Sequence, residues 1–302
     1  MLEMHIYAGN GRPCSELNEM PETPEQWLDV ANDYDTLWNF PHCLGAIDGK
    51  HIILQSPINS GSEFYNYKGF FSIVLLAVVD AKYNFLYVNT GCQGRISDGG
   101  VFNNCELNEK LKNNALNIPQ PTALPTRTEE IPFYFVADEA LSENMMKVYA
   151  GYHERGSKER IYNYRLCRAR GVVENVFGIL SAVFRVLRKP MLLEPKTATS
   201  VVTAITCLHI FLRKGNNTQV YTPADSFDEE SNGQVRLGNW REGNNDMTGM
   251  LPLQIRPRRA TRSAHNIRNE IAEYCIQQGS VSWQGDFSMA KFQILSSKFI
   301  KK

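Results

Sequence analysis

The sequence predicts an α/β fold in which helices flank a mixed β-sheet. Two observations predict it. Three apolar runs that suit strands follow one another closely, and a helical segment then leads to a fourth run of the same kind. Strands joined by short local connections form an antiparallel meander, whereas a helical crossover adds a parallel strand beside it. We therefore expect three antiparallel strands with a fourth strand parallel to one of them.

The four expected strands are apolar and bounded by turn residues. The first extends from Cys43 to Gln55, and the second is the nearly continuous apolar run Phe70–Asp80. The third covers Phe85–Asn89, and the fourth, Phe133–Ala137, ends at Asp138. Runs rich in Val, Ile and Leu are typical of strands that are covered on both faces of a sheet.

Helical signals surround these strands. Thr23 is an expected N-cap, because Pro24 suits the first helical position. The clearest helical period in the chain places five apolar side chains on one face of the segment that follows Val172. The expected helices cover Pro24 to about Asp33, a segment that starts within Ser97–Gly100 and continues over Val101–Asn113, then Ser142–Val148, Val172–Leu187, Ala198–Leu212 and Arg262–Gln278. This order of strands and helices is that of a ribonuclease-H-like mixed sheet flanked by helices, an order that other α/β folds share.

Composition sets the broad class. The 302 residues are 43% hydrophobic and 21% charged, which is typical of a globular protein. Lys plus Arg and Asp plus Glu both number 32, which excludes a globally basic nucleic-acid binder but allows a local basic stripe. The longest apolar run, Ile73–Val79, is far shorter than the roughly 18 residues that a membrane helix needs, so no membrane partner is expected.

Changes in composition along the chain predict three parts. Residues 1–40 form an N-terminal extension with a short helix, and residues 41–214 form the α/β domain. Residues 215–302 form a polar linker and a C-terminal helical tail, because the stretch from 216 to 251 is rich in Gly, Asn and Asp.

Four acidic residues occupy unusual positions. Asp48 interrupts the first strand, Asp98 opens the first long helix, Asp138 ends the fourth strand, and Glu174 lies on the most regular helix. Asp98 suits a helix N-cap equally well, and Asp138 suits a strand-end turn. A charge inside a buried strand is costly unless it is paired or bound to a metal, so Asp48 is the hardest to explain as an ordinary structural residue.

Glu174 shares one helical stripe with Arg170, Gly178, Ser181 and Arg185, opposite the apolar face. The stripe is either a solvated face or it lies over the carboxylates of the sheet, with Gly178 leaving room one turn on. Clustered carboxylates repel one another, and a divalent cation relieves the repulsion. Ligands that are all oxygen favour Mg²⁺ or Mn²⁺, and a pair of such ions can promote phosphodiester hydrolysis.

Five short motifs stand in the order and spacing of one known family. They are GAIDGKH (45–51), SEFYNYKG (62–69), GRISDGGVF (94–102), VADEA (136–140) and NYRLCRARGVVENVFG (163–178). Over roughly residues 40–213 the chain resembles PIF/Harbinger-type transposases and their domesticated nuclease relatives, which belong to the DDE endonuclease superfamily. The resemblance implies a ribonuclease-H-like fold and metal-dependent DNA cleavage by a nuclear enzyme.

Matched motif by motif, the resemblance implies that Asp48, Asp138 and Glu174 are the three catalytic acids. The same three residues and Asp98 would be the ligands of a divalent cation, Mg²⁺ or Mn²⁺. The family also implies DNA as a partner and a separate Myb/SANT-like DNA-binding partner protein.

The chain departs from the family pattern at several points. Val183 lies in a segment where the family usually carries a basic residue, and Ile210 follows Leu-His where the family often has Asn. These departures leave open a catalytically silent DNA-binding or protein-interaction module on the same fold. A ribonuclease of this fold also fits the spacing of the acids.

Residues 155–189 contain nine Lys or Arg and only two acids. This charge run is either a solvated helix face or a phosphate-binding track beside Glu174. Lys68, in the second motif, is a further expected DNA contact, and the basic run 256–259 suits nuclear localisation, although such runs are common by chance. The expected members of the track are Arg165, Arg168, Arg170 and Arg185.

Overall fold

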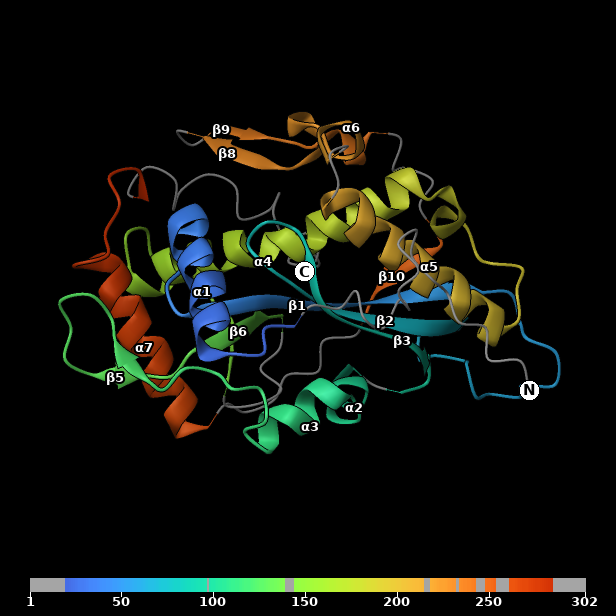
Figure 1. Ribbon diagram of the computed structural model, residues 1–302, viewed down its shortest axis with the longest axis horizontal. Coiled ribbons are helices and arrows are strands. Elements are labelled where there is room, and N and C mark those ends of the chain that lie inside the picture. The colour runs from blue at the N-terminus through green and yellow to red at the C-terminus, as the bar shows by residue number, and fades with distance from the viewer. Residues whose placement is uncertain are drawn as a thin grey trace.

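A mixed sheet forms the centre of the structure, a computed structural model in which residues 20–96, 98–138, 144–214, 218–231, 234–242, 248–253 and 261–284 are described. The strand order is β3-β2-β1-β6-β7, and β10 also pairs with β1 (Figure 1). The strands are β1 (Cys43–Leu54), β2 (Phe71–Val79), β3 (Phe85–Gln93), β6 (Tyr134–Ala137), β7 (Met145–Met146) and β10 (Met250–Pro252).

The predicted topology is confirmed. Strands β1, β2 and β3 form an antiparallel meander, and β6 is parallel to β1. Strand β1 changes its partner along its length, because Ile47 lies opposite Ala137 of β6 whereas His51 lies opposite Leu251 of β10. Asp48 follows Ile47 directly. Along β1 it therefore lies just after the pairing with β6 ends and before the pairing with β10 begins at Lys50.

Helices cover both faces of the sheet, which confirms the predicted fold class. Helices α4 and α5 pack on one face, and the short helices α2 and α3 lie on the other (Figure 1). The helices are α1 (Pro24–Trp38), α2 (Asp98–Asn103), α3 (Glu106–Lys112), α4 (Lys158–Val183), α5 (Pro195–Lys214), α6 (Thr218–Tyr221) and α7 (Arg262–Ile276).

Helix α1 begins where the sequence predicts. The Thr23 hydroxyl accepts a hydrogen bond from the Gln26 N–H, and the Gln26 side chain accepts one from the Thr23 N–H, which makes a capping box. The helix continues past Asp33 to Trp38, because Trp27, Ala31 and Tyr34 bury an apolar stripe against the domain. The short helix expected within 1–40 therefore packs on the sheet domain.

Two other predicted helices were wrong in extent. The helix expected to start within 97–100 and to continue to Asn113 does begin at Asp98, but it is divided into α2 and α3. Asn103 and Asn104 are weak helix formers, and Cys105 is the N-cap of a new helix. Helix α4 begins at Lys158, well before the expected Val172, because the Ser157 hydroxyl accepts a hydrogen bond from the Arg160 N–H.

The helix expected over 142–148 was also wrong, because its described part contains a strand. Met145 and Met146 form β7, which lies parallel to β6. Each is 1% exposed and they pack on opposite faces of the sheet, which is the alternation of a strand.

The described residues after 214 pack on the domain. Helix α7 packs against α4, and β10 adds to the central sheet. Strands β8 (Glu229–Ser231) and β9 (Gln234–Arg236) form a separate ribbon, as do β4 (Thr122–Ala123) and β5 (Glu130–Ile131). The division of the chain at residues 40 and 214 stays a prediction.

Judged by length and composition alone, α5 is the one described helix that is long and apolar enough to cross a membrane. One side of it packs on β3 and β2 and contributes Ala198, Val202 and Ile205 to the core. On the other side, Leu208 and Phe211 are about half exposed. The expected absence of a membrane partner stays a prediction.

Candidate functional site

Asp48 lies in the middle of β1, on the sheet face that α4 covers. Its Oδ2 atom lies 2.8 Å from the Nζ atom of Lys50, and the two side chains are 6% and 14% exposed. Lys50 Nζ also lies 5.4 Å from the centre of the Phe177 ring on α4. The buried charge of Asp48 is thus balanced by a cation from the same strand face, as burial of a carboxylate requires.

Asp138 comes directly after β6 and lies beside Asp48. Ile47 and Ala137 are register partners in parallel strands, and Asp48 and Asp138 are the next residues of their chains. Neighbouring strands are separated by about 4.8 Å, so Asp48 and Asp138 lie next to each other across the two chains. The sheet therefore brings these two predicted site residues together.

Glu174 reaches the same place from α4. One guanidinium nitrogen of Arg170, Nη1, lies 2.8 Å from Asp138 Oδ1 and 2.6 Å from Glu174 Oε1. The two carboxylate oxygens cannot be farther apart than the sum of those two distances. The structure thus joins Asp138 and Glu174 through a single atom of Arg170.

Arg170 is the most deeply buried member of this group, with 2% of its side chain exposed, against 14% for Asp138 and 16% for Glu174. Burial by itself lowers the pKa of Arg170. The carboxylates of Glu174, Asp138 and Asp48 raise it by more, so the net pKa lies above the ordinary value. Arg170 is therefore a permanent cation that approaches the carboxylates from the protein interior.

Asp48, Asp138, Glu174, Lys50 and Arg170 are called the acid cluster below. In donor chemistry the cluster fits a hard divalent cation, because three carboxylates from two adjacent strands and the facing helix supply only oxygen. Within the described part of the chain, however, no three His, Cys, Asp or Glu side chains are grouped as metal ligands. Two protein cations supply the positive charge here, so the metal-ligand roles stay predictions.

Asp98 begins α2, but its side chain lies outside the described residues. Its predicted role as a fourth ligand therefore stays a prediction.

The stripe on α4 that contains Glu174 does not lie over the carboxylates along its whole length. Helix α4 is buried on nearly every side, and the space beside Gly178 is filled by Trp240. The Trp240 Nε1–H and the Asp228 N–H both donate to Asn175 Oδ1, at 2.8 Å and 2.9 Å. The room that Gly178 leaves serves packing, not a ligand.

Two more arginines of the expected phosphate track contact other parts of the protein. Arg165 is 1% exposed and donates hydrogen bonds to the carbonyl oxygens of Asn39 and Gly279. Arg168 lies over the rings of Trp38 and Trp283, and burial lowers its pKa to about 10. With Arg170 in the acid cluster, none of these three arginines forms a surface track in this structure.

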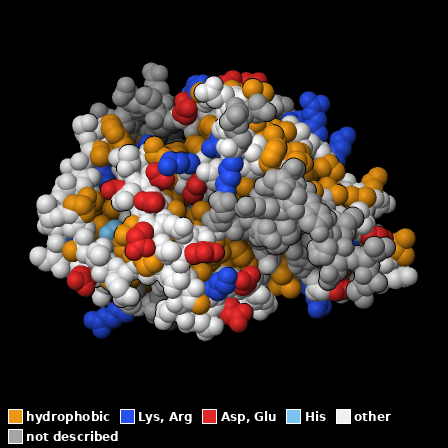
Figure 2. Space-filling model, viewed as in Figure 1, with side chains coloured by type: hydrophobic (Ala, Val, Ile, Leu, Met, Phe, Trp, Pro, Cys, Tyr) orange, Lys and Arg blue, Asp and Glu red, His pale blue; other side chains and the backbone are white. Residues whose placement is uncertain are grey.

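Arg185 and Lys68 are exposed, as a phosphate contact requires. Lys68 Nζ donates to the carbonyl oxygen of Pro252 at 2.8 Å. On the face in view, basic side chains lie in separate small groups (Figure 2). DNA contact by Arg185 and Lys68 stays a prediction, and the basic run 256–259 lies outside the described residues.

A buried polar network that the sequence reasoning missed holds the SEFYNYKG segment. His51 Nδ1 lies 3.0 Å from Ser72 Oγ, which accepts a hydrogen bond from Asn66 Nδ2 at 2.9 Å. Asn66 Oδ1 in turn accepts from the Lys68 N–H. Burial lowers the pKa of His51 to about 4, so it stays neutral. The sequence signal for this network was that His51 lies in the first of the five motifs and Asn66 in the second.

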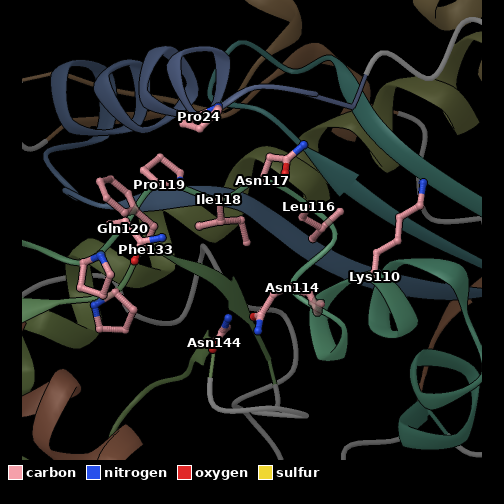
Figure 3. A pocket seen from close by; sticks show the side chains of 13 residues that line it. Pro24, Lys110, Asn114, Leu116, Asn117, Ile118, Pro119, Gln120, Phe133 and Asn144 are labelled. Atoms are coloured by element: carbon pink, nitrogen blue, oxygen red, sulfur yellow. The ribbon is translucent and has the colours of Figure 1, made fainter.

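A pocket of about 480 Å³ lies away from the acid cluster. Pro24, Asn117, Ile118, Phe133 and Asn144 line it, together with parts of α3 and the loop that follows (Figure 3). None of the predicted site residues lines this pocket.

Comparison with known proteins gives two matches. The family model described as DDE superfamily endonuclease matches residues 47–209, a range that includes all three predicted catalytic acids. Protein ALP1-like of Arabidopsis thaliana is 28% identical over 117 residues, which are 38% of this chain and 29% of that protein. The chain thus matches less than a third of the relative's length. No solved structure matches the chain significantly.

Proposed function

Because the chain belongs to the DDE superfamily endonuclease family, we propose that it is a divalent-metal-dependent DNA endonuclease of the Harbinger transposase-derived type. The proposed reaction is phosphodiester hydrolysis by two-metal catalysis. The acid cluster is the observation that supports the proposal most directly. Asp138 and Glu174 are far apart in the sequence yet contact one nitrogen atom, and Asp48 lies on the neighbouring strand.

In this proposal Asp48, Asp138, Glu174 and Asp98 hold Mg²⁺ or Mn²⁺. The bound ions would activate a water molecule or a 3′-hydroxyl and stabilise the leaving oxygen. The chain itself positions one carboxylate on β1, one directly after the adjacent strand β6 and one on the facing helix α4. Their partial burial also strengthens every charge interaction at the cluster.

DNA is the proposed substrate, and exposed Arg185 and Lys68 are its proposed phosphate contacts. A separate Myb/SANT-like DNA-binding protein as partner and a nuclear location complete the proposal. Both come from the Harbinger resemblance.

One observation favours a second candidate, a catalytically silent DNA-binding or protein-interaction module. Arg170 and Lys50 already balance much of the negative charge of the three acids. A silent protein of this fold would keep the acids as partners of these two cations, and the charge balance would hold the domain together without a metal.

A nicking assay on supercoiled plasmid, with Mg²⁺, Mn²⁺ or EDTA, separates the candidates. We expect nicking that needs metal and is lost in Glu174→Gln. The matched control is Glu106→Gln, at an exposed glutamate paired with Lys110, and it should nick like the parent. Nicking that survives in Glu174→Gln or in EDTA would contradict the endonuclease. Cleavage of an RNA substrate alone would support a ribonuclease instead.

A further inference from the structure

We propose that Arg170 is the built-in counter-ion of the acid cluster and that it exchanges with the divalent cation. The guanidinium and the metal would compete for the same two atoms, Asp138 Oδ1 and Glu174 Oε1. The inference rests on the proposed function, because it takes the divalent cation from there.

The contacts of Arg170 are the first support. A single nitrogen, Nη1, contacts both carboxylates, at 2.8 Å and 2.6 Å, and the side chain is 2% exposed. Buried carboxylates would repel one another if no cation separated them. Arg170 supplies that cation from within α4, so a positive charge already stands between Asp138 and Glu174 without a metal.

The distances make the two cations mutually exclusive. Mg²⁺ lies about 2.1 Å from a ligating oxygen. An ion bonded to both Asp138 Oδ1 and Glu174 Oε1 would therefore lie within a few ångströms of Nη1, which is already close to both atoms. Two positive centres so close together in a mostly buried site repel strongly. Metal binding then requires Arg170 to release one or both carboxylates, and this release sets the metal affinity.

The direct test is the Kd of Mn²⁺, followed by electron paramagnetic resonance of the free ion. Three proteins are compared: the parent, Arg170→Gln, and Arg165→Gln. Arg165 is the matched control, because it lies on the same helix, is equally buried, and contacts backbone carbonyls and Gln284 instead of the cluster. We expect Arg170→Gln to bind Mn²⁺ at least about tenfold more tightly than the parent, because one repelling charge is gone. Arg165→Gln should match the parent.

Equal or weaker binding by Arg170→Gln, with clear binding by the parent, overturns the exchange and leaves the endonuclease proposal intact. Failure of both proteins to bind Mn²⁺ overturns both proposals. If Arg170→Gln is unfolded without metal, circular dichroism is followed as Mn²⁺ is added. Refolding supports the exchange, because the ion then supplies the missing charge, and continued unfolding at millimolar Mn²⁺ overturns it.

Discussion

Trp240 lies directly against Gly178 of α4 and leaves no space for a side chain there. A Cβ atom at position 178 would lie 2.3 Å from Trp240 Cδ2. Trp240 also donates to Asn175, the residue that follows Glu174. The segment after α5 is thus packed onto the turn of α4 that carries the third predicted acid.

Gly178→Ala should therefore destabilise the protein. Overpacking a filled site costs about 1–3 kcal/mol, and urea unfolding measures it. Gly171→Ala is the control on the same helix, because a Cβ atom there has nothing within 4 Å. It should be neutral or stabilise by up to about 1 kcal/mol, since Ala is the better helix former. Equal losses in both variants would show that Trp240 does not limit position 178.

Asp48→Asn should lower the stability of the metal-free protein. The substitution leaves Lys50 charged and mostly buried without its carboxylate partner. Breaking a buried ion pair costs about 3 kcal/mol or more, and adding Lys50→Met should restore most of the loss because no unpaired charge remains. Urea unfolding in EDTA measures both variants. A rise in stability for Asp48→Asn would mean that repulsion among the carboxylates outweighs the Lys50 pair.

Stability should fall as the pH decreases from about 6.5 to 4. His209 is 0% exposed, its Nε2–H donates to the Tyr83 carbonyl, and Nδ1 accepts from the Tyr221 hydroxyl. Burial lowers its pKa to about 4, so between the two pKa values the unfolded chain binds more protons than the folded one. The loss from His209 is at most about 3 kcal/mol.

Urea unfolding at pH 7.5 and pH 4.5 checks this dependence. His209→Gln lacks the titrating group, so its stability should change less between the two pH values than that of the parent. An identical pH dependence in the two proteins would assign the effect to other groups, such as His42 and His51, whose pKa values burial also lowers to about 4.

Arg185→Ala and Lys68→Ala should each weaken DNA binding regardless of sequence. Each lost phosphate contact reduces the slope of log K against log salt by about one. Arg165→Ala is the contrasting variant, because that side chain is buried and should affect stability without changing the slope of the folded protein. Unchanged slopes for Arg185→Ala and Lys68→Ala would place the DNA elsewhere on the surface.

The sheet was predictable because each main strand carries its own apolar pattern. The run that became β2 is apolar almost throughout, which is typical of a strand buried on both faces. Strand β7 could not be found in this way, because two methionines carry no period and their strand pairing depends on β6. The first part of α4 was missed because it looks polar in the sequence, and its polar side chains are paired with α7 and the residues that follow it, as Lys158 is with Glu273 and Arg165 with Gly279.

The convergence of Asp48, Asp138 and Glu174 was predictable from the order of the motifs, but the cations among them were not. Arg170 was assigned to a phosphate track because it lies in a basic run. Its position four residues before Glu174 was the available signal for an ion pair on the helix. Its contact with Asp138 depends on how α4 lies across the sheet, which local sequence does not encode.

Anomalous X-ray diffraction from crystals grown with Mn²⁺ is the most direct test of the acid cluster as a divalent-cation site. The account predicts an anomalous peak within bonding distance of Asp138 and Glu174, with Arg170 Nη1 withdrawn from at least one of them. It would be contradicted if, at a Mn²⁺ concentration that saturates cleavage, no peak lay at the acid cluster and Arg170 still bridged the two carboxylates.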